Sequence, residues 1–297
     1  MIETIEILST DFLDQYRPLI EEQKKLARFI GIGTGWHYPL DWSWIITHLG
    51  KVEGKRILDA GAGLGVLQWY LAEQGAEVIS VDRESRACIP FHLRRRYRIQ
   101  GLRSGDLLSP LQMMNPFHRF ALNPKKVKGL ARSVLSLSRP RIPGRAPGNI
   151  IIYNQDLKNL VDIPSNSIDA IISVSALEHN PPEDLPIVVG ELERVLKPSG
   201  AMIVTLAAGR ERDWLHEPSR GWCYTDATLR KVFGLSPAAR SNYDQFDVLF
   251  EALKECHELR DQLAGVYYRS KRNGMPGGKW DPQYQPVGVI KIKANES

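Results

Sequence analysis

The 297-residue sequence has few of the features that mark secreted, membrane-spanning or metal-binding proteins. Its three cysteines, Cys88, Cys223 and Cys256, are widely spaced and form no CxxC pair, which favours free thiols over a disulfide framework. The apolar run at 201–208 is interrupted by Thr205 and is far shorter than the roughly 20 residues that span a bilayer. The sequence contains no HxH or HExxH pattern that would indicate a metal site. With no basic and apolar leader at its start, the chain is expected to be cytoplasmic.

Length and composition favour one large globular domain with additions rather than a series of modules. Hydrophobic residues make up 43% of the chain and charged residues 25%, which is ordinary for a soluble protein. We expect a helical, aromatic-rich cap over residues 1–54 and the main domain over 55–297. Within the main domain we expect an insertion at about 88–149 and C-terminal additions from about 209.

The apolar pattern between residues 55 and 208 alternates between strands and helices. Short β-branched or apolar runs predict strands at 56–59, 76–81, 150–153, 168–174 and 201–207, with a last strand near 287–293. Helical spacing is found at 11–30, 66–74, 183–196, 226–233 and 245–263, and Asp41 is expected to cap a further helix at 42–49. This alternation predicts an α/β fold with a doubly wound, mostly parallel sheet.

A glycine-rich loop, Asp59-Ala60-Gly61-Ala62-Gly63-Leu64-Gly65, directly follows the first of these strands and precedes a helix. In open α/β sheets the ligand crevice lies at the carboxyl ends of the strands, where glycine allows close approach to the backbone. Asp82 ends the next strand, the position at which a carboxylate accepts hydrogen bonds from ribose hydroxyls. A dinucleotide fingerprint would need glycine where Val66 stands, and Asp59 would repel a pyrophosphate. The loop therefore favours a cationic nucleoside ligand such as S-adenosylmethionine.

Five segments in this order resemble class I S-adenosylmethionine-dependent methyltransferases. LDAGAGLG is similar to the family's first motif and VISVD to its second, while Gln155-Asp156-Leu157 resembles the adenine-binding segment. SIDAIISVSALEHN and LERVLKPSGAMIVTL resemble the fourth strand and the helix–turn–strand that follows it. The resemblance covers residues 55–208, apart from the expected insertion, and implies a Rossmann-like methyltransferase fold with S-adenosyl-L-methionine as cofactor.

The resemblance also assigns roles to individual residues. It implies a cofactor site formed by Asp59, Ala60, Gly61, Gly63, Asp82, Arg83, Asp156, Leu157 and Ser175. Asp156 has a second interpretation, because aspartate in a turn before a helix is also a good cap. Glu178 and His179 follow the fourth strand, and His179 is a candidate general base, since imidazole titrates near neutral pH. Alternatively, the two residues only brace this loop.

Several aromatic and histidine residues lie outside these motifs. Trp36, His37 and Tyr38 follow a glycine-rich stretch and are candidates for a lid over the site, whereas Trp42 and Trp44 are expected to pack in the core. Three residues after the fifth strand are candidates for contact with the methyl acceptor: His216, Trp222 and Tyr224. We expect methyl transfer to an O, N or C atom of a small molecule, with an amphipathic acceptor as one candidate. The alternatives are a nicotinamide-dependent oxidoreductase and a non-catalytic nucleotide-binding protein of the same fold.

A strongly basic block separates the second and third expected strands. Residues 83–149 contain 15 Lys or Arg and two Asp or Glu, a formal charge of +13, so the rest of the chain carries −8. Lys125, Lys126, Lys128 and Arg132 flank an apolar stripe with helical spacing, which is typical of a helix on an anionic membrane surface or on a partner. The stripe can equally pack on the protein's own core. Aromatic stacking residues are sparse in the block, so nucleic acid is the less favoured partner.

Overall fold

The computed structural model describes residues 2–114, 144–263 and 279–295, and its centre is one mixed sheet of eleven strands. The strands follow the order β10-β1-β11-β7-β6-β2-β3-β5-β4, with β9 pairing to β7 and β8 to β9. Their bounds are β1 Thr4–Ile7, β2 Arg56–Ala60, β3 Glu77–Asp82, β4 Arg98–Gly101, β5 Asn149–Asn154, β6 Ile168–Val174, β7 Leu196–Ala208, β8 Trp214–His216, β9 Gly221–Tyr224, β10 Arg240–Ser241 and β11 Gln285–Ile292.

The parallel centre of this sheet confirms the expected fold class. Strands β4, β5, β3, β2, β6 and β7 all pair in parallel, and β11 then runs antiparallel to β7. The position of β1 next to β11 could not be predicted, because four residues are too few for a periodic pattern. In β1 the side chains of Ile5 and Ile7 are fully buried, so the N-terminal segment contributes to the same core as the motifs.

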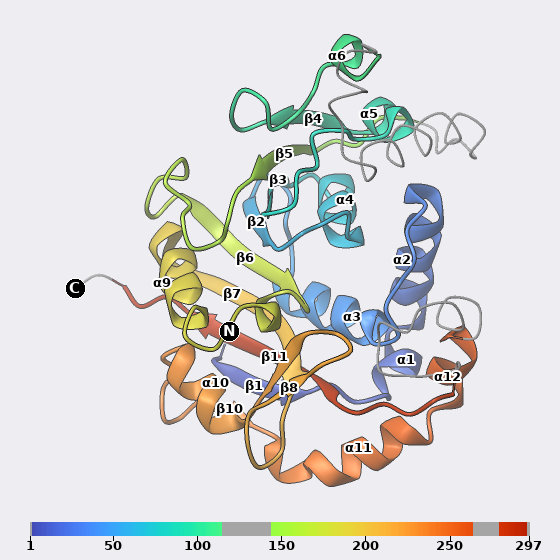
Figure 1. The fold of residues 1–297 in the computed structure, drawn as a ribbon, viewed down its shortest axis with the longest axis vertical. Coiled ribbons are helices and arrows are strands. Elements are labelled where there is room, and N and C mark those ends of the chain that lie inside the picture. Colours follow the sequence, from blue (N-terminus) through green and yellow to red (C-terminus); the bar gives the residue numbers. More distant parts are fainter. Residues whose placement is uncertain (1, 115–143, 264–278, 296–297) are drawn as a thin grey trace.

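Helices cover both faces of the sheet (Figure 1). One face packs on α2 (Arg17–Ile30), α3 (Tyr38–Leu49) and α4 (Val66–Glu73), and the other on α9 (Leu185–Val195) and α10 (Asp226–Val232). The remaining helices of the described residues are α1 (Phe12–Gln15), α5 (Phe91–Arg96), α6 (Pro110–Met114), α11 (Phe246–Lys254), α12 (His257–Leu263) and the 3₁₀ helices η2 (Leu177–His179) and η3 (Tyr243–Gln245). Successive residues of a strand, such as Ile57 and Leu58, pack in the cores on opposite faces of the sheet. Because both faces are buried, the strands are continuous apolar runs.

Three expected helices differ from their predicted bounds, and the one expected at 11–30 is divided at Tyr16 into α1 and α2. α3 begins at Tyr38, because Pro39 fits the first turn, where a missing N–H costs nothing. Asp41 therefore lies inside the helix rather than at its N-cap, and its carboxylate contacts His37 instead. The expected helix at 245–263 is divided into α11 and α12, which are separated by Glu255 and Cys256.

We expected the basic block to be an insertion of helices and loops. Its described part also extends the sheet by one strand. It forms α5 and the edge strand β4, which pairs in parallel with β5. Two of its arginines bind the protein itself: Arg94 donates to the Ile89 carbonyl at 3.0 Å, and Arg96 pairs with Glu73 at 3.2 Å. The amphipathic stretch around Lys125 lies outside the described residues, so the expected membrane contact stays a prediction. Within the described ranges, no helix is both long enough and apolar enough to cross a bilayer.

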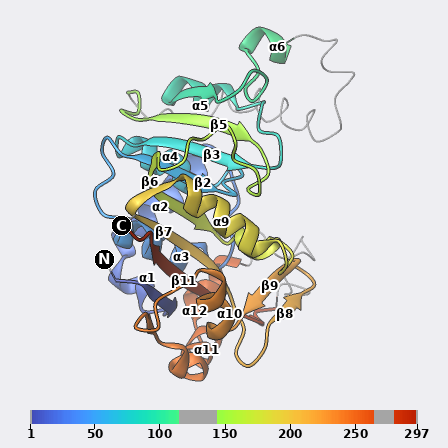
Figure 2. The ribbon, with the colours of Figure 1, turned by 90° about the vertical axis from the view of Figure 1, so that its left-hand side faces the viewer.

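Beyond β7 the chain forms a hairpin that the sequence did not predict. β8 and β9 pair antiparallel, with Trp214 opposite Cys223, and β9 also pairs with the end of β7. Figure 2 shows this hairpin projecting from the sheet beside α10. The turn between the two strands, residues 217–220, reaches the same region as the loop after β6, so the hairpin helps to shape the site.

Candidate active site

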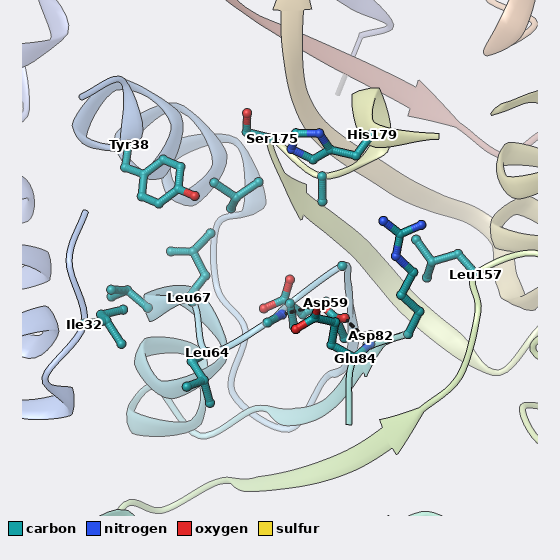
Figure 3. A pocket seen from close by; sticks show the side chains of 18 of the residues that line it. Ile32, Tyr38, Asp59, Leu64, Leu67, Asp82, Glu84, Leu157, Ser175 and His179 are labelled. Carbon is teal, nitrogen blue, oxygen red and sulfur yellow. Dashed lines mark hydrogen bonds between the residues drawn. The ribbon is translucent and has the colours of Figure 1, made fainter. Parts of the chain in front are cut away.

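A cavity of about 590 Å³ opens at the carboxyl ends of β2, β3 and β6. The glycine loop forms its floor, and the segment before α3 forms part of its opposite wall. In Figure 3 the carboxylates of Asp59 and Asp82 lie close together, and Ser175 and His179 face them across the space. The Tyr38 hydroxyl points into the cavity from the N-terminal segment (Figure 3). The topology thus places the motif residues in one crevice.

The glycine loop fits this crevice because side chains are absent where the backbone is crowded. Gly61 has φ +74°, and a Cβ at this position would lie 2.4 Å from the Ala176 Cβ. Gln68 of α4 supports the loop from below, since its amide donates to the carbonyls of Gly63 at 3.2 Å and Gly65 at 3.1 Å. Sequence reasoning missed Gln68, although its place in the first turns after the loop made it a candidate.

Asp82 fixes the loop and still has capacity to bind a ligand. One carboxylate oxygen accepts from the Gly63 N–H at 2.8 Å, and the other accepts from the Glu84 N–H at 2.7 Å. An ionised carboxylate has about four lone-pair positions, so two hydrogen bonds leave further acceptor sites on the same group. Arg83 and Glu84 line the cavity next to it.

Asp59 is a buried acid at the end of β2, with 3% of its surface exposed. Burial raises the pKa of its carboxyl to about 7, the positive charge of Arg86 opposes this, and the negative charge of Asp82 adds to it. Arg86 was not predicted from the sequence. Its guanidinium is buried below the loop and donates to the carbonyls of Gly63 and Tyr153, both at 3.2 Å. A cation bound above the loop would give Asp59 a second positive partner.

The raised pKa of Asp59 leads to a test of stability. Its folded pKa of about 7 exceeds the ordinary 3.8, so the folded state favours the neutral acid and loses stability as pH rises between these values. We expect Asp59→Asn to be more stable than wild type at pH 8 without ligand. From pH 5 to pH 7 the difference in unfolding free energy should widen by about 1.4 kcal/mol per pH unit. Urea unfolding of both proteins measures this, and a difference that is constant with pH would contradict it.

The other expected cofactor residues lie in different environments. Asp156 and Leu157 line the cavity, and Asp156 also accepts from the Lys158 N–H at 2.9 Å, so it caps the turn as well. Ser175 lines the cavity with φ +46°, an uncommon conformation for a residue other than glycine and one that often occurs at functional sites. Ala60 is fully buried in β2 and is not part of the cavity wall.

A second cavity of about 600 Å³ adjoins the first. The two share Tyr38, Ser175 and His179 in their walls. The second is lined further by Gly35, Trp36, His37, Glu178, Ala207, residues 217–221 and Tyr284. Trp36 and His37 thus line this cavity as part of a packed aromatic wall, with Trp36 3% exposed. Trp42 and Trp44 are buried in the core as expected, although Trp42 also reaches the first cavity.

The residues expected to contact an acceptor after β7 are placed differently. His216, Trp222 and Tyr224 belong to the β8–β9 hairpin and are not part of the wall of the second cavity. The turn that joins the two strands lines it instead, and His216 packs edge-to-face against Tyr284 with ring centroids 5.1 Å apart. Pairing in the hairpin, which the sequence did not reveal, accounts for this difference.

Glu178 and His179 have unlike surroundings despite being neighbours. Glu178 is 3% exposed, burial raises the pKa of its carboxyl, and it accepts a short hydrogen bond from the Ser175 hydroxyl. His179 is exposed, and its Nδ1 lies 3.1 Å from the Arg220 carbonyl. A carbonyl only accepts, so Nδ1 carries the hydrogen and Nε2 is the free acceptor.

Comparisons with known proteins find similarity to methyltransferases. A family model described as a methyltransferase domain matches residues 112–204. The tRNA U34 carboxymethyltransferase of Psychrobacter arcticus is 33% identical over 72 residues, which is 24% of this chain and 20% of that protein. The ubiquinone biosynthesis O-methyltransferase of Leptothrix cholodnii is 32% identical over 78 residues, 22% of this chain and 33% of that one. The chain therefore matches a fifth to a third of the length of these relatives.

Solved structures of similar shape are also found. Phosphoethanolamine N-methyltransferase 2 of Haemonchus contortus, in complex with phosphomonomethylethanolamine and S-adenosylhomocysteine, is 14% identical with a TM-score of 0.49. The alignment covers 96% of this chain and 60% of that one. The 1,6-didemethyltoxoflavin-N1-methyltransferase of Burkholderia thailandensis is 15% identical with a TM-score of 0.41, over 96% and 87% of the two chains.

Proposed function

This chain belongs to the class I S-adenosylmethionine-dependent methyltransferase family, and from this premise we propose that it transfers a methyl group from S-adenosylmethionine to a small molecule. The observation that carries the proposal is the pairing of Asp59 and Asp82 beside a glycine loop at the carboxyl ends of β2 and β3. In this proposal the first cavity holds the cofactor, and the second holds the methyl acceptor.

The residues of the first cavity fit the cofactor in charge and in shape. Asp82 has spare acceptor capacity for two ribose hydroxyls, and Asp59 places negative charge where the ammonium and sulfonium groups would lie. Asp156 and Leu157 stand at the end of β5, at the place proposed for the adenine. At Gly61 and Gly63 the absent side chains leave the backbone accessible to the ligand. Arg83 and Ser175 complete the proposed binding wall.

When bound, the cofactor supplies an activated methyl group, and the protein's task is to orient the acceptor and to manage its proton. The shared wall of Tyr38, Ser175 and His179 lies between the two cavities, where the methyl group would pass. His179 is one candidate base there. Glu178, buried beneath Ser175, helps to hold this wall in position.

A cavity of about 600 Å³ favours a small acceptor over a macromolecule, since pockets of a few hundred cubic ångströms suit compact ligands. The two relatives named above are called a tRNA carboxymethyltransferase and a ubiquinone biosynthesis O-methyltransferase. Of these acceptor types, the second is closer to what this cavity would accept.

The competing nicotinamide function is separated from methyl transfer by titration calorimetry. Wild-type protein is expected to bind S-adenosylhomocysteine with a one-to-one stoichiometry and to give no saturable heat with NADH. Saturable binding of NADH with no response to S-adenosylhomocysteine would overturn the proposal. A protein that binds S-adenosylhomocysteine but methylates nothing in fractionated metabolite pools would fit the non-catalytic alternative.

A further inference from the structure

A histidine–carboxylate pair lies at the start of α3, outside all the motifs. The Nδ1 atom of His37 is 2.6 Å from Oδ2 of Asp41, one helical turn later. Asp41 is fully buried, and His37 is 7% exposed and lines the second cavity. Because Asp41 occupies Nδ1, the other ring nitrogen, Nε2, carries the lone pair in the neutral imidazole. This nitrogen remains for a group in the cavity.

A second carboxylate faces the same histidine. Glu178 comes from η2 and lines the cavity, and its charge interacts with that of His37 across the space. Its Oε2 atom is buried and has no hydrogen-bond partner among the described residues. A proton gained by His37 would therefore lie between the side chains of Asp41 and Glu178. Asp41, in contact with Nδ1, is placed to stabilise the imidazolium that forms when the ring takes up a proton.

We propose that His37, positioned by Asp41, is the general base that removes the proton from a phenolic hydroxyl bound in the second cavity. The inference rests on the proposed methyl transfer and names the acceptor class of that same site. His37 would be the catalytic residue, because it contacts the acceptor, and Asp41 a positioning residue. The arrangement follows the logic of a carboxylate that holds an imidazole in one tautomer and stabilises its cation.

The walls favour a flat aromatic acceptor. Trp36, Tyr38 and Tyr284 line the cavity, and Trp36 and Tyr284 are packed with ring centroids 5.6 Å apart. An alkylammonium acceptor would also have to lose a proton, but the carboxylates around His37 would hold that proton more tightly. A phenolate is instead stabilised by the imidazolium and by Arg220 in the same wall. A phenol therefore suits these charges better than an amine does.

The proton and the electrons balance in this step. The phenolic O–H bond breaks and its proton bonds to Nε2 of His37, so the oxygen keeps the electron pair. That electron pair forms the new oxygen–methyl bond as the methyl–sulfur bond breaks. The electrons of the broken methyl–sulfur bond remain on the sulfur. The imidazolium then releases its proton to solvent.

His179 is the rival base, and its surroundings are weaker for this purpose. It is exposed, and its ring is held by the neutral Arg220 carbonyl rather than by a carboxylate. The charged and titratable groups around His37 come from several elements: Tyr38 and Asp41 of α3, Glu178 and His179 of η2, Glu217 and Arg220 of the turn before β9, and Tyr284 before β11. The experiment must therefore separate His37 from His179.

The test uses 4-nitrophenol, whose phenolate absorbs visible light, with protein saturated by S-adenosylhomocysteine. Wild type should shift the ionisation of the bound probe about tenfold toward the phenolate, as a cation beside the oxygen does. His37→Gln should bind the probe but return its titration to that of free 4-nitrophenol, and Asp41→Asn should lose most of the shift. The matched control is His48→Gln, on the same helix, where His48 bonds the Trp44 carbonyl at 2.8 Å. This control should behave like wild type.

The outcomes that would overturn the proposal are specific. They are an unchanged shift in His37→Gln, a shift lost in His179→Gln instead, no saturable change with 4-nitrophenol, or tighter binding of 4-nitrobenzylamine than of the phenol. Affinity for S-adenosylhomocysteine, measured on every variant, shows whether each still folds. The titration is repeated without that ligand, so a wild type that ionises the probe but binds no S-adenosylhomocysteine would refute the methyl transfer and keep the base.

Discussion

Asp82→Asn is expected to weaken the binding of S-adenosylhomocysteine by about 100-fold. We expect no other substitution that preserves the size and shape of the side chain to cost as much affinity. Hydrogen bonds to a charged group contribute about 1.5–3 kcal/mol each, and the amide replaces one accepting oxygen with a donor that cannot accept from a ribose hydroxyl. The change also removes one of the two bonds that Asp82 makes to the N–H groups of Gly63 and Glu84. Calorimetry at pH 8 measures the loss.

The matched control for this variant is Glu84→Gln. Glu84 is exposed and lines the same cavity, so the control removes one negative charge from the same wall. If Asp82 acts through the ribose, this control should change the affinity by less than about threefold, in the range of an exposed charge interaction. Equal losses from both variants would mean that the net charge of the wall matters and the ribose contact does not.

Gly61→Ala is expected to lower the stability of the protein by about 3 kcal/mol and to abolish binding of S-adenosylhomocysteine. The backbone at Gly61 has φ +74°, where a side chain costs about 1–2 kcal/mol. Its new Cβ would also lie 2.4 Å from the Ala176 Cβ, and relieving such overpacking costs a further 1–3 kcal/mol or so. The loop would have to move away from the segment after β6 that contains Ala176, and the cofactor wall would move with it.

Gly54→Ala separates the two causes. Gly54 has a nearly identical φ of +72°, but a Cβ there would meet nothing within 4 Å. This variant should lose only the conformational cost of about 1–2 kcal/mol and should bind ligand as wild type does. Thermal unfolding followed by circular dichroism, together with calorimetry, compares the two. A Gly54→Ala variant as unstable as Gly61→Ala would show that the contact with Ala176 is unimportant.

The parts of the fold that the sequence predicted are those with strong local signals. Strand β6 was expected at 168–174 and is found at Ile168–Val174, because an apolar run bounded by turn residues leaves little choice. The glycine loop and the two acids at the ends of β2 and β3 have similarly strong local signals. By contrast, β1 and the β8–β9 hairpin are short, and they become strands only because an edge of the sheet is available to them.

The site residues that could not be predicted from the sequence depend on contacts made only in the folded chain. Arg86 matters because folding brings its guanidinium under Gly63 and against the Tyr153 carbonyl, 67 residues away. Asp41 was interpreted as a helix cap, and only the earlier start of α3 gives it His37 as partner. The spacing of this pair, four residues apart, was the one available signal, since residues four apart meet on a helix.

The account depends on a nucleoside cation binding between the two acids at the ends of β2 and β3. A crystal structure of the protein with S-adenosylhomocysteine tests this most directly. We predict that both ribose hydroxyls lie within about 3 Å of the Asp82 carboxylate, with the amino acid portion of the ligand beside Asp59. A ligand bound elsewhere, or a first cavity that stays closed to it at saturating concentration, would contradict the account.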